Sequence, residues 1–295
     1  MDMILKSVAH QKNIRAYAAV TTDLVNEAAK LHQTMPVGTA ALGRALTACA
    51  IMGAMLKEEG ETVSIQLKGG GPLGSVFAMS GYGAKVRGYV DHPLTDLPLN
   101  KQGKLDVGGA VGVNGTLSVV RQLSVGEPYV GQVPLVSGEI GDDLTAYYAK
   151  SEQIPTAVGL GVLVDVDYSV KAAGGFIISL LPGAGEETIS LVEQGLRRVT
   201  SVTDLIVGGA DAKGILQAVL GEEELEEMEQ VTPCYCCNCS LEKMERGLVS
   251  LGRKELEELA QKPEDAELVC HFCNRKYYIS QKRLLELSQK AKPGT

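Results

Sequence analysis

Six of the seven cysteines of this 295-residue chain lie in its last 62 residues, in two short groups. The first group is CYCCNC at 234–239, and the second is CHFC at 270–273. Four thiolates satisfy a tetrahedral zinc ion, and short-spaced pairs brought together by a helical spacer are a usual way to supply them. The C-terminal segment is therefore expected to fold around a metal ion.

The downstream pair of candidate ligands is clear, but the upstream pair is ambiguous. Cys270 and Cys273 form one C-x-x-C pair. A second C-x-x-C would complete a zinc ribbon, and spacing alone favours it. Spacing leaves three upstream pairs open: Cys237 with Cys239, Cys236 with Cys239, and Cys234 with Cys237.

Zinc would decide whether the C-terminal segment folds at all. A domain of about 60 residues buries too little surface to be comfortably stable alone. Structural zinc can supply about 10–16 kcal/mol of folding free energy, which exceeds the whole stability of many domains, about 5–15 kcal/mol. Thiolates are also the form of cysteine that oxidants attack. Oxidation to disulfides would remove the ligands and, with the metal, the fold, so the chemistry permits a redox switch.

The charge distribution argues against a nucleic-acid-binding body. Residues 234–295 carry 11 Lys and Arg against 9 Asp and Glu, a net charge of +2, and the rest carries 17 against 27, a net charge of −10. Neutralising phosphates needs clustered Lys and Arg. We therefore expect no nucleic-acid partner.

No feature of the sequence indicates export or a membrane span. The start, MDMILKSVAHQKNIRAY, has an acid at position 2 and no long apolar run. The most apolar stretch, residues 45–56, is too short to cross a bilayer and is bounded by Arg44 and Lys57. We expect a buried helix there, no membrane partner and a cytoplasmic location, where reducing conditions favour metal binding or redox chemistry over permanent disulfides.

Hydrophobic periodicity predicts an α+β fold. The pattern favours a strand at 13–20, a helix from 21 capped by Thr22 or Asp23, and a second helix over 38–57 that stops near Gly60. Alternation then predicts strands, with Val63, Ile65 and Leu67 on one face of the first. Further strands are expected at 75–80, 84–90, 116–121 and 157–182 (with a turn at the internal AAGG), and a helix near 140–150.

The second half of the chain predicts a linker and a separate small domain. Amphipathic helices are expected in ETISLVEQGLRRV, with Ile189, Val192 and Leu196 on one face, and in ADAKGILQAVL. Six glutamates among 222–229 indicate a solvated helix or hinge. The elements expected beyond are helices at 240–251, 254–261 and 281–290, and a hairpin at 267–279. The predicted domains are a β-rich core domain with helices over 1–182, a helical, partly acidic linker over 183–232, and a zinc-binding domain over 233–295.

The remaining motifs have ordinary structural interpretations. The glycine stretches at 69–74 and 108–115 read as turns rather than phosphate cradles, because a nucleotide loop should follow a strand and open a helix, and Asn114-Gly115 is a hairpin signal. Cys49 reads as an inert buried thiol. The four histidines form no recognisable catalytic arrangement, and we find no ATP motif; they are His10, His32, His92 and His271.

Several of these segments resemble one known family, the bacterial redox-regulated heat-shock chaperones, or thirty-three-kilodalton chaperonins. The likeness is clearest in CNCSLEKMERGLVSLGRKELEEL joined to VCHFCNRKYYIS, which match a C-x-C-S-x-E motif, a helix, a C-x-x-C pair and an aromatic strand. The segments NIRAYAAVTTDLVNEA, SIQLKGGGPLG and DHP extend it over essentially the whole chain.

The resemblance implies an ATP-independent holdase rather than an enzyme. In this family the reduced protein binds one zinc ion per chain and is inactive. Oxidation forms disulfides, expels zinc and unfolds the C-terminal domain and the linker, and the protein then binds unfolding client proteins. Homodimers in the oxidised state are a further expectation. The matching zinc ligands are Cys237, Cys239, Cys270 and Cys273, and the implied disulfides join Cys237 with Cys239 and Cys270 with Cys273.

The two cysteines upstream of this motif, Cys234 and Cys236, depart from the family pattern and are interpreted as accessory or alternative thiols. Ser240 can cap a helix that begins after Cys239, which would fix Cys239 at a helix start. Cys236 remains the competing ligand, because Cys236-x-x-Cys239 also has good zinc spacing.

Two other classes of function stay open on the sequence. One is a zinc-ribbon binding or regulatory protein whose zinc is purely structural. The other is an enzyme whose active site lies in the N-terminal domain. A basic face on the C-terminal domain would favour the first, and activity that survives removal of 234–295 would favour the second.

Overall fold

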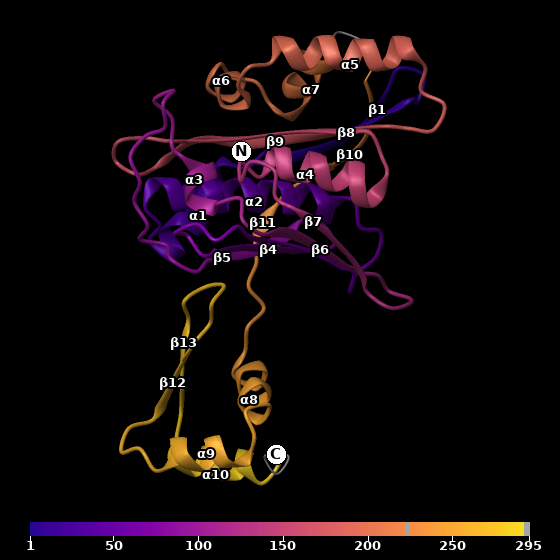
Figure 1. Cartoon of the computed structure of the whole chain (residues 1–295). Coiled ribbons are helices and arrows are strands. Elements are labelled where there is room, and N and C mark those ends of the chain that lie inside the picture. The colour runs from indigo at the N-terminus through magenta and orange to yellow at the C-terminus, as the bar shows by residue number, and fades with distance from the viewer. Residues whose placement is uncertain (222–224, 292–295) are drawn as a thin grey trace. The chain divides into compact units, whose positions relative to one another are not determined.

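The computed structural model describes residues 1–221 and 225–291. It forms two compact units, Met1–Cys236 and Cys237–Thr295. The larger unit stacks two sheets and several helices, and the smaller one combines a hairpin with short helices (Figure 1). The α+β class predicted from the sequence is confirmed.

The first sheet of the larger unit is antiparallel and is buried on both faces at its centre. Among the described residues it has five strands in the order β10-β1-β2-β9-β8. On β2, Ala16 and Ala18 face one apolar cluster while Tyr17 and Ala19 face another, which explains why the predicted strand is apolar at nearly every position. The strands are β1 (Met3–Ala9), β2 (Ile14–Val20), β8 (Thr156–Val164), β9 (Val170–Leu180) and β10 (Glu226–Val231).

The second sheet has β3 (Thr62–Lys68) near its centre. Its order in the described chain is β11-β5-β4-β3-β6-β7. The predicted alternation on β3 is confirmed, since Val63, Ile65 and Leu67 are all buried. The other strands are β4 (Ser75–Gly81), β5 (Lys85–Val90), β6 (Thr116–Gln122), β7 (Tyr129–Pro134) and β11 (Cys234–Tyr235).

Helix α2 (Pro36–Ala54) lies between the two sheets and contacts both (Figure 1). It has the length and apolar composition of a membrane span, but almost all of it is buried inside the fold. Its many Ala and Gly residues allow this close packing: at Gly53 an added Cβ would meet the Ser80 side chain at 2.0 Å. The predicted buried helix is therefore confirmed, although it ends at Ala54 rather than near Gly60.

Helix α1 (Thr22–His32) is capped from outside its own segment. Neither Thr22 nor Asp23 caps it through a side chain, contrary to the sequence prediction. The carboxylate of Asp2 instead accepts hydrogen bonds from the backbone N–H groups of Asp23 (3.0 Å) and Leu24 (2.7 Å). Asp2 is brought there because β1 pairs with β2, and that non-local contact could not be read from the local sequence.

Two further predictions about strands and turns are wrong. The AAGG stretch lies inside β9, where Gly174 and Gly175 let neighbouring backbone approach closely; the turn between β8 and β9 lies at 165–169. Residues 226–229 belong to β10 rather than to a helix or hinge, because they pair with β1. Residues 222–224 of that acidic run lie outside the described residues.

The glycine stretch at 108–115 also differs from its prediction. It contributes most of a short helix, α3 (Val107–Val111), and Asn114-Gly115 joins this helix to β6 rather than closing a hairpin. Gly70 and Gly74, in contrast, have positive φ in a turn, as predicted for 69–74. The helix expected near 140–150 is α4 (Gly141–Tyr147), continued by a π-helical turn at Tyr148–Glu152.

A layer of short helices covers the face of the first sheet that α2 does not (Figure 1). It consists of α5 (Glu186–Arg198), α6 (Val202–Val207) and α7 (Ala212–Leu220). Val192 on α5 and Ile215, Leu216 and Val219 on α7 are buried against strand residues such as Ile178. On α5, Val192 and Leu196 face this cluster, but Ile189 is exposed, contrary to the predicted stripe.

The smaller unit has the elements that the sequence predicts. They are α8 (Leu241–Val249), α9 (Arg253–Ala260), the hairpin of β12 (Ala266–Val269) and β13 (Lys276–Ile279), and α10 (Gln281–Ser288). Its apolar core among the described residues is small: Leu248, Leu256, Ile279, Leu284, Leu287 and Ala291.

Candidate metal centre

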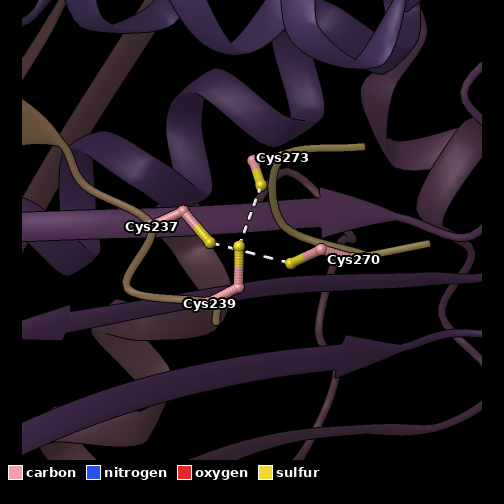
Figure 2. Close-up of side chains that lie close together, drawn as sticks. All are labelled: Cys237, Cys239, Cys270 and Cys273. Atoms are coloured by element: carbon pink, nitrogen blue, oxygen red, sulfur yellow. Dashed lines mark hydrogen bonds between the residues drawn. The ribbon is translucent and has the colours of Figure 1, made fainter. Parts of the chain in front are cut away.

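Four cysteine sulfurs converge in the smaller unit. The Sγ atoms of Cys237, Cys239, Cys270 and Cys273 all lie within 4.8 Å of one another. Cys237 Sγ is 3.7 Å from Cys270 Sγ, and Cys239 Sγ is 3.5 Å from Cys273 Sγ. Figure 2 shows the four side chains directed toward a common point.

The upstream pair is positioned by the start of α8. Ser240 is the N-cap residue, and its Oγ accepts a hydrogen bond from the backbone N–H of Lys243 (3.3 Å), as the sequence predicted. The Lys243 Nζ also donates to the carbonyl of Asn238 (2.6 Å). These bonds hold the segment that contains Cys237 and Cys239 against the first turn of the helix.

The downstream pair lies in the tight turn of the β12–β13 hairpin. The backbone N–H of Cys270 donates to the Arg275 carbonyl (2.9 Å), which closes the hairpin. The Cys270 carbonyl accepts from the N–H groups of Cys273 (3.3 Å) and Asn274 (2.8 Å). Asn274 adopts a left-handed conformation, with φ of 54°, which asparagine tolerates better than most residues. The turn thereby brings both sulfurs of the C-x-x-C pair to one side.

Three of the four thiols have pKa values shifted by their surroundings. Burial alone raises the pKa of Cys239, but hydrogen bonds outweigh it, chiefly the one donated by the Tyr277 hydroxyl over 3.1 Å, and bring this pKa down to about 7. Burial raises the pKa of Cys237 to about 12 and also raises that of Cys273. Cys239 therefore ionises at a lower pH than Cys237 or Cys273.

The cluster fits a thiophilic ion with tetrahedral preference. Zinc–sulfur bonds of about 2.3 Å in a tetrahedron place the sulfurs about 3.8 Å apart, close to the two separations observed. The grouped donors are all thiols; within the described chain no imidazole or carboxylate joins them, and His271, between the two downstream cysteines, is not one of the group.

Cys234 and Cys236 lie outside this cluster. They belong to the larger unit and are joined to each other by a disulfide. The structure thus groups Cys237 and Cys239 with the downstream pair, and it does not bring the competing Cys236 or Cys234 to the same point. The sequence predicted the aromatic strand that carries Tyr277, but not the contact of the Tyr277 hydroxyl with Cys239 Sγ. The only signal for an inward-facing Tyr277 was its position two residues before the buried Ile279 on the same strand.

The other chemically suggestive residues have structural surroundings. Cys49 is completely buried, and burial raises its pKa, as expected of an inert thiol. His32 is buried, and its Nε2 lies 2.9 Å from the Tyr235 hydroxyl. Nδ1 of His10 lies 2.9 Å from the Thr188 hydroxyl.

The fold and the cluster together define a class: a body of stacked sheets joined to a small unit that carries a candidate tetrathiolate metal site. A family model described as Hsp33 protein matches residues 2–280. The chain belongs to the Hsp33 family.

Named relatives agree with this assignment over nearly the full length. A 33 kDa chaperonin of Clostridium tetani is 46% identical over 97% of each chain, and one of Geobacillus kaustophilus is 46% identical over 99% of each. The crystal structure of a 33 kDa chaperonin (heat shock protein 33 homolog) from Thermotoga maritima has a TM-score of 0.89, with 37% identity over 98% of both chains. The resemblance stated from the sequence is confirmed, and the relatives are named as chaperonins.

Proposed function

We propose that the protein is a redox-regulated holdase that needs no ATP. In the reduced state Cys237, Cys239, Cys270 and Cys273 hold one zinc ion and the protein is inactive. Oxidation of these thiols releases zinc, unfolds the small unit and the linker over 183–232, and lets the protein bind unfolding clients. The observation that carries the proposal is the convergence of four sulfurs within 4.8 Å in a unit with little other core.

The small unit is the part of the chain most dependent on a metal. Its buried apolar side chains are few, and a unit of about 60 residues is marginal without a staple. Zinc binding contributes about 10–16 kcal/mol in small zinc domains. The free energy that zinc contributes is larger than the stability that the apolar cluster supplies alone. Release of the metal and unfolding of the small unit are therefore one event.

The pairing of the disulfides decides whether oxidation unfolds the unit. Two disulfides form when the four zinc-bound thiolates give up four electrons to the oxidant and the Zn²⁺ ion leaves. The separations allow either pairing, since all four sulfurs lie within 4.8 Å. Bonds between Cys237 and Cys270 or Cys239 and Cys273 would tie together residues 33 or 34 positions apart and would stabilise the fold.

Bonds within each pair would instead leave α8 and the hairpin unlinked. A disulfide that closes so short a loop restrains the unfolded chain little. We therefore propose the pairs Cys237 with Cys239 and Cys270 with Cys273, which the family resemblance also implies. Peptide mapping of the oxidised chain by mass spectrometry tests this pairing.

The surface offered to clients is proposed to come from the linker helices. Helices α5 and α7 bury apolar side chains against the first sheet, and undocking them would expose two apolar faces. Unfolding proteins expose apolar surface of their own, so contact is favourable and requires no ATP. Cytoplasmic clients, an oxidised homodimer and the absence of nucleic-acid partners belong to the same proposal.

An aggregation assay tests this function. A heat-unfolded client is followed by light scattering in the presence of the reduced, zinc-loaded chain or the peroxide-treated chain, while a chromophoric chelator reports zinc. Only the oxidised chain should suppress scattering, and suppression should follow zinc release. Equal activity of the two forms would favour purely structural zinc.

A further inference from the structure

Cys234 and Cys236 flank a buried anchor at the edge of the second sheet. Between them, Tyr235 is buried, and its hydroxyl donates to the Gly88 carbonyl (2.8 Å) and lies 2.9 Å from His32 Nε2. Because alternate residues of a strand point to opposite faces, the two cysteines lie together on the face opposite the Tyr235 side chain. Both are half-buried there.

The backbone around the pair is held in place by β5. The N–H of Cys234 donates to the Ala84 carbonyl (3.2 Å), and that of Cys236 donates to the Val86 carbonyl (2.8 Å). Their Cα atoms are 5.7 Å apart, within the usual range for a disulfide of about 4.4–6.8 Å. The two sulfurs therefore meet without any rearrangement of the sheet.

The pair is not part of the candidate metal site. The four-sulfur cluster contains neither cysteine, and the division between the two compact units falls directly after Cys236. The other cysteine of the larger unit, Cys49, is completely buried and cannot exchange with the pair in the folded state.

A purely structural role explains the pair poorly. A bond across a sequence separation of 2 removes little freedom from the unfolded chain. The strand is already fixed by its backbone hydrogen bonds and by Tyr235. What the arrangement does provide is a preformed, partly accessible disulfide, and exposed disulfides are the labile ones that take part in thiol–disulfide exchange.

We propose that Cys234 and Cys236 form a second redox couple, which exchanges with low-molecular-weight disulfides and does so with zinc still bound. One thiol attacks a sulfur of the small disulfide, giving a mixed disulfide and one small thiol. The second thiol attacks the protein sulfur of that mixed bond and releases the other small thiol. The two protein thiols are oxidised, the small disulfide is reduced to two thiols, and the two protons end on them.

The experiment uses the full-length, reduced chain loaded with zinc and oxidised glutathione as the small disulfide. After quenching, the protein is denatured and alkylated, its thiols are mapped by mass spectrometry, and bound zinc is counted. Two of the seven cysteines should become protected, namely Cys234 and Cys236, with zinc still at one per chain. Zinc loss in step with the first oxidised pair, or continued alkylation of both cysteines, would overturn the inference.

Two controls separate exchange from a structural bond. The double variant Cys234→Ser/Cys236→Ser should bind zinc as the parent does and lose no thiols to oxidised glutathione. Reducing the Cys234–Cys236 bond in the parent should leave the melting temperature of the larger unit unchanged within about 1 °C, since a short loop contributes little. A marked fall in that temperature would show a structural staple instead.

The outcome is distinguishable from that of the proposed function. A chain that forms this disulfide but never becomes a holdase refutes the proposed function alone. A switchable holdase whose Cys234 and Cys236 stay reduced refutes this inference alone.

Discussion

At the scale of single residues, Cys239 differs from its three neighbours because the Tyr277 hydroxyl donates a hydrogen bond to its sulfur. The C-x-C and C-x-x-C groups could be predicted from sequence, since their spacing is local. The position of Cys234 and Cys236 at the edge of the second sheet could not be predicted, because it depends on the pairing of β11 with β5, which is about 150 residues away in sequence. The same holds for the Asp2 cap of α1.

Replacing Tyr277 with Phe should weaken zinc binding. The substitution keeps the ring but removes the donor that stabilises the Cys239 thiolate, so the pKa of Cys239 should rise and its proton should be harder to displace. Losing such an outer partner typically costs about 10–100-fold in metal affinity. Competition titration with a chromophoric chelator measures it. Tyr278→Phe is the matched control, since Tyr278 donates to the Glu267 carboxylate outside the cluster, and its zinc affinity should match the parent's.

Serine substitutions should identify the upstream ligands. Cys237→Ser should lose tight zinc binding, because a serine hydroxyl does not replace a thiolate ligand. Cys236→Ser should retain one zinc ion per chain, because Cys236 lies outside the grouped sulfurs. Metal content measured after dialysis decides between them, and the reverse result would move the site to the C-x-x-C pair.

At the scale of elements, the helices and strands with clear periodicity could be predicted, and those set by distant partners could not. The alternation of β3 and the caps of α8 are local signals. The acidic strand β10 has no such local signal, because its exposed side chains show no apolar alternation. It is held by backbone pairing with β1 and by ion pairs such as Lys6 with Glu229 and Lys213 with Glu227, each at 2.8 Å.

The packing of α5 on α7 should be sensitive to one glycine. An added Cβ at Gly195 would lie 1.6 Å from the Val219 carbonyl oxygen, so Gly195→Ala must push the helices apart. Overpacking of this kind costs about 1–3 kcal/mol. Chemical denaturation should show the loss, and the reduced variant should begin to suppress client aggregation. Gly247→Ala, on α8 with open space around it, should instead stabilise its helix by about 0.5–1 kcal/mol.

At the scale of the whole molecule, the two units differ in how they are stabilised. The larger one buries extensive apolar clusters on both faces of its first sheet, whereas the smaller one has a limited core beside four thiols. The boundaries predicted for the three domains remain a prediction. In the structure α5–α7 are packed on the first sheet within the larger unit, so a separate linker would exist only after they undock.

Removing zinc should therefore melt the chain in stages. A chelator together with an oxidant should unfold the small unit while the body stays folded, because only the small unit depends on the metal. Limited proteolysis should cut first after residue 237 and then within 183–232, since mobile segments are cut before packed ones. Mass spectrometry of the fragments locates the cuts. Early cleavage inside the β-rich body would contradict this order.

Strand β10 has a consequence of its own. It occupies the outer side of β1, and its side chains are mostly exposed, so little apolar burial retains it. Whenever it detaches, β1 becomes an open edge whose backbone N–H and C=O groups lack partners. Such an edge accepts any extended chain that can complete the ladder, whatever its side chains. Loss of this glutamate-rich strand would thus replace an internal backbone partner with an open sheet edge. That edge would bind another chain through main-chain hydrogen bonds, independently of the sequence of that chain.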